Sequence, residues 1–447
     1  MTPDPHETAD RIIALVRAKA AGAEAEVTVR HGTEGLTRFA NSFIHQNVAE
    51  ETSHVVLRVA EDGHVAFARL DGPTDNGTLT RLVDGALESA RVRPVDPDWP
   101  GVAAVATTTN VEHWDDATAA ATPDDRARVV AEFVAAAGGL ETAGACSTSA
   151  TVAAFANTAG QRLVGRSTFA SLDGIARTSD SDGSGRFASA SIADLDGSLV
   201  GGRAGAKARE SQHPTDLDPG RYEVVLEPQC VENLLQFLFV YGFNGRTVEE
   251  GRSFVRLGEL QFDPAISLRD DVTDPGTVGL LFDIEGTPKR RVDVVVDGVT
   301  STALHTRRTA ARAGNESTAS AVEDGDIWGA LPQNVVFEAG DRTDDALVAG
   351  VERGLLVTDF WYTRILDPRT QVVTGLTRNG VWLIEEGRVV RPIRNLRFTQ
   401  SYIEAVGPGA VRGIGRGQAL IPGGFEGIHL VPSLHLASWN FTGGAKG

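Results

Sequence analysis

The chain has 447 residues, 41% of them hydrophobic and 23% charged, a composition typical of a water-soluble globular protein of about two or three domains. Its formal net charge of -18 argues against nucleic-acid binding, which needs a basic face, and no stretch approaches the roughly 18 apolar residues of a membrane span. Two cysteines, Cys146 and Cys230, are too few for a disulfide framework, and the N-terminal segment lacks the pattern of a signal peptide, so we expect a cytoplasmic protein.

Two kinds of periodicity alternate along the first half of the chain. Apolar residues at helical spacing predict helices at residues 9–20, 78–91, 122–138 and 197–211. Alternating apolar and polar residues predict strands within residues 25–70 and 143–193, with breaks or turns at 31–32, 61–63 and 157–160. The helix at 122–138 has the clearest start, because Thr122 suits the N-cap and Pro123 the first helical position.

A polar segment with two prolines, residues 212–220, is the predicted domain boundary. We expect an N-terminal domain of residues 1–212, whose strand-rich central part begins at about residue 143, and a C-terminal domain of residues 220–447. The second half is mostly strand and turn. The chain therefore predicts an α+β fold, with an N-terminal domain of antiparallel strands and helices followed by a β-rich domain, rather than a doubly wound parallel sheet.

The segment at residues 226–253 predicts a helix over 231–241, with one apolar stripe and with Glu232, Asn233 and Gln236 off the stripe. Taken alone, it is interpreted as a core helix with one polar edge. Cys230 immediately precedes it. Because a thiolate at a helix N-terminus can have a lowered pKa, Cys230 is a better candidate for reactivity than Cys146, although most free cysteines only pack.

Histidines do not form a metal motif in this sequence. His429 and His435 would be roughly 20 Å apart on an extended strand, too far to bind one ion unless Pro432 bends the chain sharply. Three others are spread over neighbouring strands, where cross-strand pairing could bring two together: His45, His54 and His64.

Other chemical motifs are weak or absent. There is no GxSxG, SxxK or HExxH. GIGRGQ, at residues 413–418, is not followed by the helix that a phosphate-binding loop needs. The acid pairs at 270–271 and 385–386 are interpreted as turn and surface charges.

Several segments nevertheless resemble, in order, the TldD/PmbA family of two-subunit TldD/TldE zinc metalloproteases. No single motif is decisive, but together they extend over nearly the whole chain. They are RFANSFIHQN (38–47), VEEGRSFVRLGELQFDPAISLRDD (248–271), FDIEGTPKRRVDVVVDGV (282–299), LHTRRTAARAG (304–314), the segment with Pro332 and Asn334, and GIGRGQ (413–418).

In the resembled family, TldD-type chains carry HExxxH and a later cysteine as zinc ligands, whereas TldE/PmbA-type chains lack them and pair with a TldD-type chain. The matching positions here are Gln236, Phe237 and Tyr241, and residues 412–417 contain no cysteine. An amide and a phenol are poor zinc ligands, and a phenylalanine is neither ligand nor base. The resemblance thus implies a TldE/PmbA-like chain without catalytic residues, metal or cofactor of its own, the zinc being in the TldD-like partner.

The implied function is that of a non-catalytic subunit in a cytoplasmic heterodimeric zinc-dependent peptidase that degrades or processes unfolded peptides. Its expected partners are a TldD-like catalytic subunit and an extended peptide, which strand edges could bind by main-chain pairing, and not nucleic acid or membrane. Two alternatives stay open. One is a self-associating peptide-binding or structural protein without a protease partner, and the other is an enzyme with an unrecognised site such as Cys230.

Overall fold

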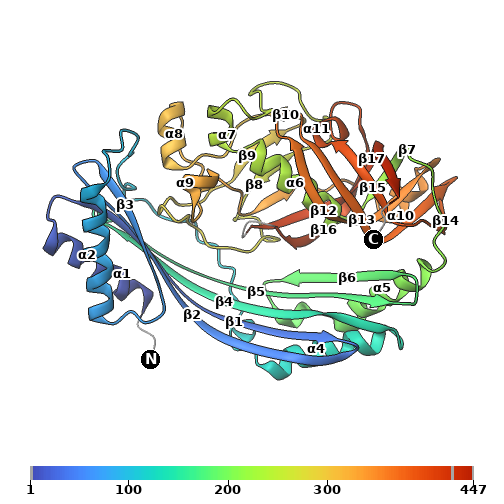
Figure 1. Cartoon of the computed structure of the whole chain (residues 1–447), viewed down its shortest axis with the longest axis horizontal. Helices are drawn as coiled ribbons and strands as arrows, with labels where there is room; N and C mark the ends of the chain where they lie inside the picture. The colour runs from blue at the N-terminus through green and yellow to red at the C-terminus, as the bar shows by residue number, and fades with distance from the viewer. Residues whose placement is uncertain (1–3, 424–426, 445–447) are drawn as a thin grey trace.

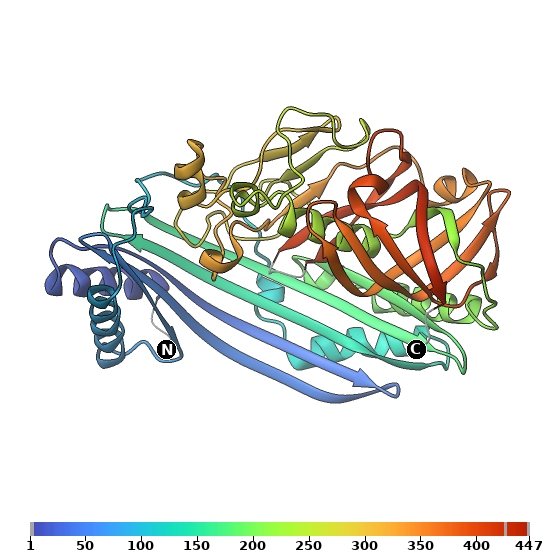
Figure 2. The same cartoon turned by 45° about the horizontal axis from the view of Figure 1, so that its top comes forward.

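The computed structural model describes residues 4–423 and 427–444 and contains two sheets, one from each half of the chain. The first sheet extends beneath the domain that the second half forms (Figures 1 and 2). The predicted α+β class is confirmed. Among the described residues, no helix combines the length and apolarity needed to cross a membrane.

The first sheet is antiparallel, and its six strands follow the order β3-β2-β1-β4-β5-β6. The expected break at residues 31–32 is wrong, because β1 runs through Gly32, which pairs with Thr52 on one side and Thr151 on the other. The strands are β1 (Glu24–Ala40), β2 (Phe43–Glu61), β3 (His64–Asp71), β4 (Glu141–Asn157), β5 (Arg162–Arg177) and β6 (Asp182–Ser189).

Helices cover one face of this sheet in two groups. The helix predicted from Thr122 is confirmed, with a reciprocal capping box between Thr122 and Asp125. The other helices predicted in this half are also confirmed. The first group is α1 (Pro5–Lys19) and α2 (Asn76–Val92), and the second is α3 (Asp116–Ala119), α4 (Pro123–Ala136) and α5 (Gly197–Glu210).

The opposite face of the sheet contacts the second domain, because alternate residues of a strand point to opposite sides. On β1, Val27 and Val29 belong to the core shared with α1 and α2. Thr28, between them, donates instead to the backbone oxygen of Ile284 at 3.1 Å. On β4, Phe155 packs with Phe282 in a small core between the domains.

The second sheet has eleven strands. Nine of them follow the order β10-β9-β8-β11-β17-β15-β13-β12-β7, and β7 also pairs with β17, which closes part of the sheet into a ring. The other two of the eleven, β14 and β16, pair with β13 and β17 respectively. The strands are β7 (Gly220–Leu226), β8 (Leu268–Asp270), β9 (Val292–Val296), β10 (Val299–Thr300), β11 (Val335–Phe337), β12 (Arg353–Asp367), β13 (Val372–Glu385), β14 (Arg388–Pro392), β15 (Leu396–Ser401), β16 (Val411–Pro422) and β17 (Ile428–Gly444).

Helix α6 (Pro228–Tyr241) is the long helix of this domain and packs against β12 and β17 within the largest core. Residues 212–219 lie between α5 and β7, where the chain passes from the first layer into the second sheet, and residue 220 begins β7. The remaining helices are short: α7 (Gly245–Glu249), α8 (Arg307–Ala313), α9 (Gly325–Trp328), α10 (Asp344–Ala349) and α11 (Tyr402–Ala405).

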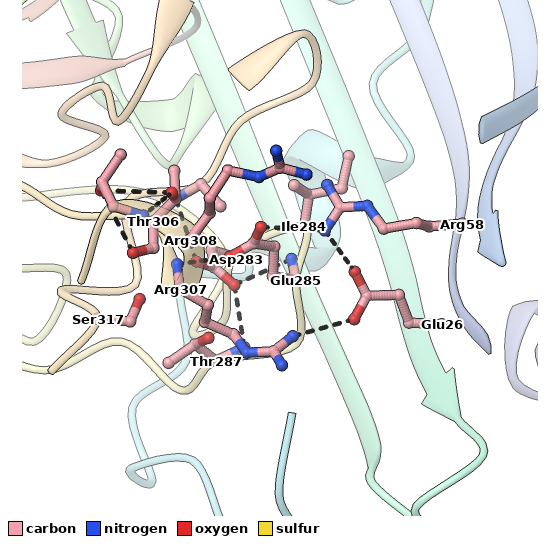
Figure 3. A network of polar contacts seen from close by, with 12 residues as sticks. Glu26, Arg58, Asp283, Ile284, Glu285, Thr287, Thr306, Arg307, Arg308 and Ser317 are labelled. Carbon is pink, nitrogen blue, oxygen red and sulfur yellow. Dashed lines mark hydrogen bonds and ion pairs between the residues drawn. The ribbon is translucent and has the colours of Figure 1, made fainter. Parts of the chain in front are cut away.

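A buried network of charges joins the two halves of the chain (Figure 3). Glu26 of β1 and Arg58 of β2 come from the first sheet, and Glu285 and Arg307 come from the second domain. Arg58 Nη1 lies 2.7 Å from Glu26 Oε1 and 3.0 Å from Glu285 Oε1. Arg307 Nη1 lies 3.1 Å from Glu26 Oε2, and its backbone N–H donates to Glu285 Oε2 at 2.9 Å. Each carboxylate thus contacts cationic or N–H groups from both sides of the joint.

Burial shifts the protonation of the acids at this joint. It raises the pKa of Glu26 to about 7, with Arg58 and Arg307 acting in the opposite direction. It also raises the pKa of Asp283 to about 7, helped by the charge of Glu285. The backbone at Gly286, next to Glu285, lies directly against Phe155 of the first sheet. A Cβ on Gly286 would lie 2.1 Å from Phe155 Cε1, so this position needs glycine.

Replacing Glu26 should change how the free energy of unfolding depends on pH. The folded-state pKa of Glu26, about 7, exceeds the ordinary value of 4.5, so the folded protein holds an extra proton between these values. The stabilisation from Glu26 is therefore full below its ordinary pKa and is lost as the pH rises through its folded-state pKa, by up to about 1.4 kcal/mol per pH unit.

The substitution Glu26→Gln should accordingly flatten the fall in urea midpoint between about pH 5 and pH 7. Glu34→Gln changes an exposed acid on the same strand and should keep the wild-type dependence. A Glu26→Gln protein with an unaltered pH profile would contradict the assigned pKa.

Candidate functional site

A cleft of about 900 Å³ lies between the first sheet and the second domain. Gln229, in the first turn of α6, lies at its wall, so α6 leads from the cleft into the core. The main lining segments are residues 186–191 from the end of β6 onward, 418–422 of β16, 275–278 and 112–115.

Two strand edges border this cleft. β6 is the last strand of the first sheet, and among the described residues it pairs with β5 alone. β16 pairs with β17, and in the described part of the chain its residues 418–422 pair with no second strand. GIGRGQ, at residues 413–418, lies on β16. Free edges present backbone donors and acceptors that an extended chain can pair with.

The side chains in the cleft are a mixture of apolar and charged groups. Phe187 of β6 is 38% exposed and lies at the wall together with Leu420 of β16. Arg186 lies in the wall of the cleft, with Nε 2.9 Å from Asp173 Oδ2 on β5 and Nη1 2.8 Å from Asp359 Oδ2 on β12. Burial raises the pKa of Asp359, and Arg186 acts in the opposite direction. The cleft can therefore offer apolar contacts beside backbone hydrogen bonds.

The three positions matched to a zinc motif do not form a ligand set. Phe237 is buried, and its ring lies 6.0 Å from the ring of Tyr241 and 5.8 Å from that of Tyr402. Gln236 and Tyr241 are half-buried. Within residues 4–423 and 427–444, no group of three or more His, Cys, Asp or Glu side chains is placed to hold a metal ion. The donor set around α6 does not fit catalytic zinc.

The interpretation of α6 as a core helix with one polar edge needs one correction. Glu232 is buried, not on an exposed edge, and its Oε1 lies 3.6 Å from His429 Nδ1 on β17. In the described structure neither atom has a hydrogen-bond partner. Leu430, next to His429, lines the cleft. This buried carboxylate–imidazole pair was missed because Glu232 and His429 are far apart in the sequence.

The histidines considered as possible metal ligands do not come together in the structure. His435 Nε2 lies 3.0 Å from Glu223 Oε1, and burial lowers the pKa of His435, with Glu223 opposing the shift. His54 contacts two carboxylates, at 2.6 Å from Asp71 and 2.8 Å from Glu323. Cross-strand pairing does not bring two of the N-terminal histidines together, since His54 lies opposite Asp71 and His64 opposite Glu61.

The acid pair at 270–271 is not at the surface as expected. Asp270 is buried on β8 and accepts from the backbone N–H of Asn334 at 2.7 Å, and burial raises its pKa. Asp271 is also buried and lies 3.2 Å from Arg269. Residues 385–386 are exposed, as expected. The expectation for residues 270–271 was wrong because partners such as Asn334 come from distant segments of the chain.

The proposed advantage of Cys230 as a reactive thiol is wrong. Cys230 is buried, and burial raises its pKa well above the ordinary value. Its thiol donates to the backbone oxygen of Val357 at 3.6 Å. Burial also raises the pKa of Cys146 to about 12. Desolvation therefore outweighs the helix terminus, and both side chains are protonated packing groups at neutral pH.

Comparisons with known proteins agree on one family. Residues 219–443 match the profile of the PmbA/TldA metallopeptidase C-terminal domain. A protein of Methanothermobacter thermautotrophicus named a metalloprotease is 24% identical over 217 residues, which make up 46% of this chain and 46% of that protein. The matched segment thus spans less than half of that relative.

Solved structures resemble the whole chain. TldE from Thermococcus kodakarensis superposes with a TM-score of 0.87 at 17% identity, covering 98% of this chain and 100% of that one. A protein described as a candidate modulator of a DNA gyrase, from Thermotoga maritima, gives a TM-score of 0.85 at 18% identity, covering 98% and 99% of the two chains. At such identities the likeness establishes the fold alone.

Truncating Phe237 should destabilise the protein. Phe237→Ala removes a buried ring from the contacts with Tyr241 and Tyr402, which we expect to lower the free energy of unfolding by about 3–5 kcal/mol. Gln236→Ala, on the same helix but half-buried, should cost less than about 1 kcal/mol. Urea unfolding followed by fluorescence measures both changes. Equal, small effects would contradict the packing role of Phe237.

Neither thiol should react in the native protein. The reagent DTNB should modify no cysteine of the folded chain within minutes and both, Cys146 and Cys230, in concentrated guanidinium. Rapid native modification that Cys230→Ser abolishes would show that Cys230 is accessible and ionised.

Proposed function

The chain belongs to the PmbA/TldD metallopeptidase family, and we propose that it is a non-catalytic, TldE-like subunit of a two-chain zinc-dependent peptidase. The observation that carries this proposal is the packing of Phe237 where a catalytic relative would have the glutamate of HExxxH. A phenylalanine cannot take a proton from water, and the neighbouring Gln236 and Tyr241 are poor zinc ligands. Zinc and the activated water would belong to a TldD-like partner.

The contribution of this chain would be to bind the substrate. The free edges of β6 and β16 border one cleft, and pairing with such an edge uses main-chain groups that every peptide has. Only an unfolded or extended segment could present its backbone in this way. Phe187 and Leu420 would add apolar contacts without strict sequence selection. These features favour unfolded peptides as substrates, which the complex would degrade or process in the cytoplasm.

A second candidate function is a self-associating peptide-binding protein that has no protease partner. The cleft and its strand edges belong to this chain alone and would serve that role equally well. An independent enzyme based on Cys230 has no such support, because the thiol is buried and its pKa is raised.

Reconstitution with a TldD-like chain tests the proposal. We expect this chain to contain no stoichiometric zinc and to cleave no unfolded peptide alone, and to form with a partner carrying HExxxH a complex whose cleavage chelators abolish. Gln236→Ala in this chain should leave cleavage intact, whereas replacing the glutamate of the partner's motif should remove it. Stoichiometric zinc with chelator-sensitive cleavage by this chain alone would overturn the proposal. Homo-oligomers formed despite the partner's presence would favour the second candidate.

The cleft itself can be tested in the same assay. Phe187→Asp places a charge at the apolar wall and should lower kcat/KM for an unfolded peptide by roughly tenfold. Val164→Asp is the control, because Val164 is 60% exposed on the adjacent strand β5 and does not line the cleft. Equal effects of the two substitutions would contradict peptide binding at the cleft.

A further inference from the structure

One segment of the second domain differs in charge from the rest of the molecule. The chain as a whole has a net charge of -18, yet residues 353–397 contain more basic than acidic residues. This segment forms β12, β13 and β14 and enters β15, and β12, β13 and β15 follow one another in the second sheet (Figure 1). Its arginines are Arg353, Arg364, Arg369, Arg378, Arg388, Arg391, Arg394 and Arg397.

Aromatic and arginine side chains meet on one face of these three strands. Trp361 of β12 lies opposite Leu376 of β13, which lies opposite Arg397 of β15. Trp361 is 54% exposed, whereas its neighbour Phe360 is buried in the core against Phe398. We call this surface the arginine–aromatic face, and it consists of Trp361, Tyr362, Arg364, Leu376, Arg378 and Arg397.

The backbone is distorted so that two consecutive aromatic residues are exposed. Tyr362, 64% exposed, has a φ of 53°, in the left-handed region that residues other than glycine rarely adopt. The pairing of β12 with β13 shifts register between Trp361 and Arg364, as at a bulge. Such a backbone conformation is strained and is more frequent at functional surfaces. Regular alternation would have turned one of the two rings inward.

Two of the three arginines of this face, Arg364 and Arg378, contact aromatic rings and not carboxylates. The guanidinium carbon of Arg378 lies 4.4 Å from the centre of the Trp361 ring, and that of Arg364 lies 4.4 Å from the centre of the Tyr362 ring. Arg353 and Arg394, in the same segment, do make ion pairs. In the described residues, no carboxylate lies within ion-pair distance of Arg364, Arg378 or Arg397. Their charge is available to an acidic group from outside.

We propose that the arginine–aromatic face is the docking surface for the metal-bearing partner chain, which would meet it with an acidic surface. The inference rests on the proposed function above. Tryptophan, tyrosine and arginine are the residue types that contribute most to protein interfaces. A second copy of this chain docked face to face would bring arginine against arginine, which disfavours a symmetric homodimer. The charge therefore selects a different chain as the occupant.

The position of the face suits this role. Asp359 lies two residues before Trp361 on β12, and its carboxylate contacts Arg186 in the wall of the cleft. A partner bound to the arginine–aromatic face would therefore lie beside the cleft where we expect the peptide to bind. Its metal site could then act on a peptide that this chain holds.

Binding of a TldD-like chain to charge-reversed variants tests this inference. Arg364→Glu combined with Arg397→Glu should weaken the complex at least about tenfold, and the wild-type affinity should fall as ionic strength rises. Arg388→Glu, an exposed arginine on β14 outside the face, is the matched control and should change the affinity less than about twofold. Trp361→Ala should weaken the complex without altering net charge. Circular dichroism and melting curves confirm that each variant is folded.

The possible outcomes separate the two proposals. Loss of binding in the face variants but not in Arg388→Glu would support the inference. Unchanged binding in folded face variants would overturn it while leaving the proposed function standing. A wild-type chain that binds no TldD-like partner would overturn the proposed function and this inference with it. Binding of a single-stranded RNA oligonucleotide that the face variants lose, and that the partner does not compete with, would overturn protein docking in favour of a nucleic-acid platform.

Discussion

The buried contacts among Glu26, Arg58, Glu285 and Arg307 are the interaction on which the arrangement of this protein depends. Charges taken out of water are costly unless they meet opposite charges and hydrogen-bond donors in good geometry. Here each domain supplies one acid and one base, so neither domain can satisfy its own pair as fully alone. Docking in one orientation satisfies all four groups, and a shifted orientation would leave buried charge without a partner. The network therefore selects one orientation of the two domains, and this effect is larger than its net contribution to the free energy of folding.

A fixed joint gives the cleft its shape. The cleft lies between β6 of the first sheet and β16 of the second domain, so its shape depends on how the two domains are docked. Arg186 and Asp359 form another ion pair across the same boundary. Two strand edges are thus held on either side of a space of about 900 Å³. In the proposed function this chain supplies a rigid binding surface and the partner supplies the chemistry. The packing of Phe237 against its aromatic neighbours on and beside α6 is compatible with that division.

Much of the fold could be predicted from local sequence. Thr122 and Pro123 mark the start of α4, and the turn at residues 61–63 lies between β2 and β3 as expected. The break expected at Gly32 was wrong, because strand pairing on both sides of β1 outweighed the low strand propensity of glycine. Cys230 was misjudged for a similar reason, since the sequence reveals its place at a helix terminus but not the burial that raises its pKa.

The charged residues of the candidate site were the hardest to foresee. Asp270 was interpreted as a surface charge and Glu232 as part of the polar edge of a core helix, yet both are buried against partners from distant segments. Glu285 belongs to a block that carried the family resemblance, but its part in the domain joint depends on Arg58, which lies in the other domain. Local periodicity reports which face of a strand or helix is apolar. It does not report which charges tertiary contacts will bring together.

Hydrogen–deuterium exchange tests the central claim, that this chain holds an extended peptide between the edges of β6 and β16. The complex with a TldD-like chain would be compared with and without an unfolded peptide, the partner being inactivated at the glutamate of its motif so that the peptide stays intact. The account predicts slower exchange in residues 182–189 and 418–422 when the peptide is present. Protection confined to other strands, or no change in either segment, would contradict it.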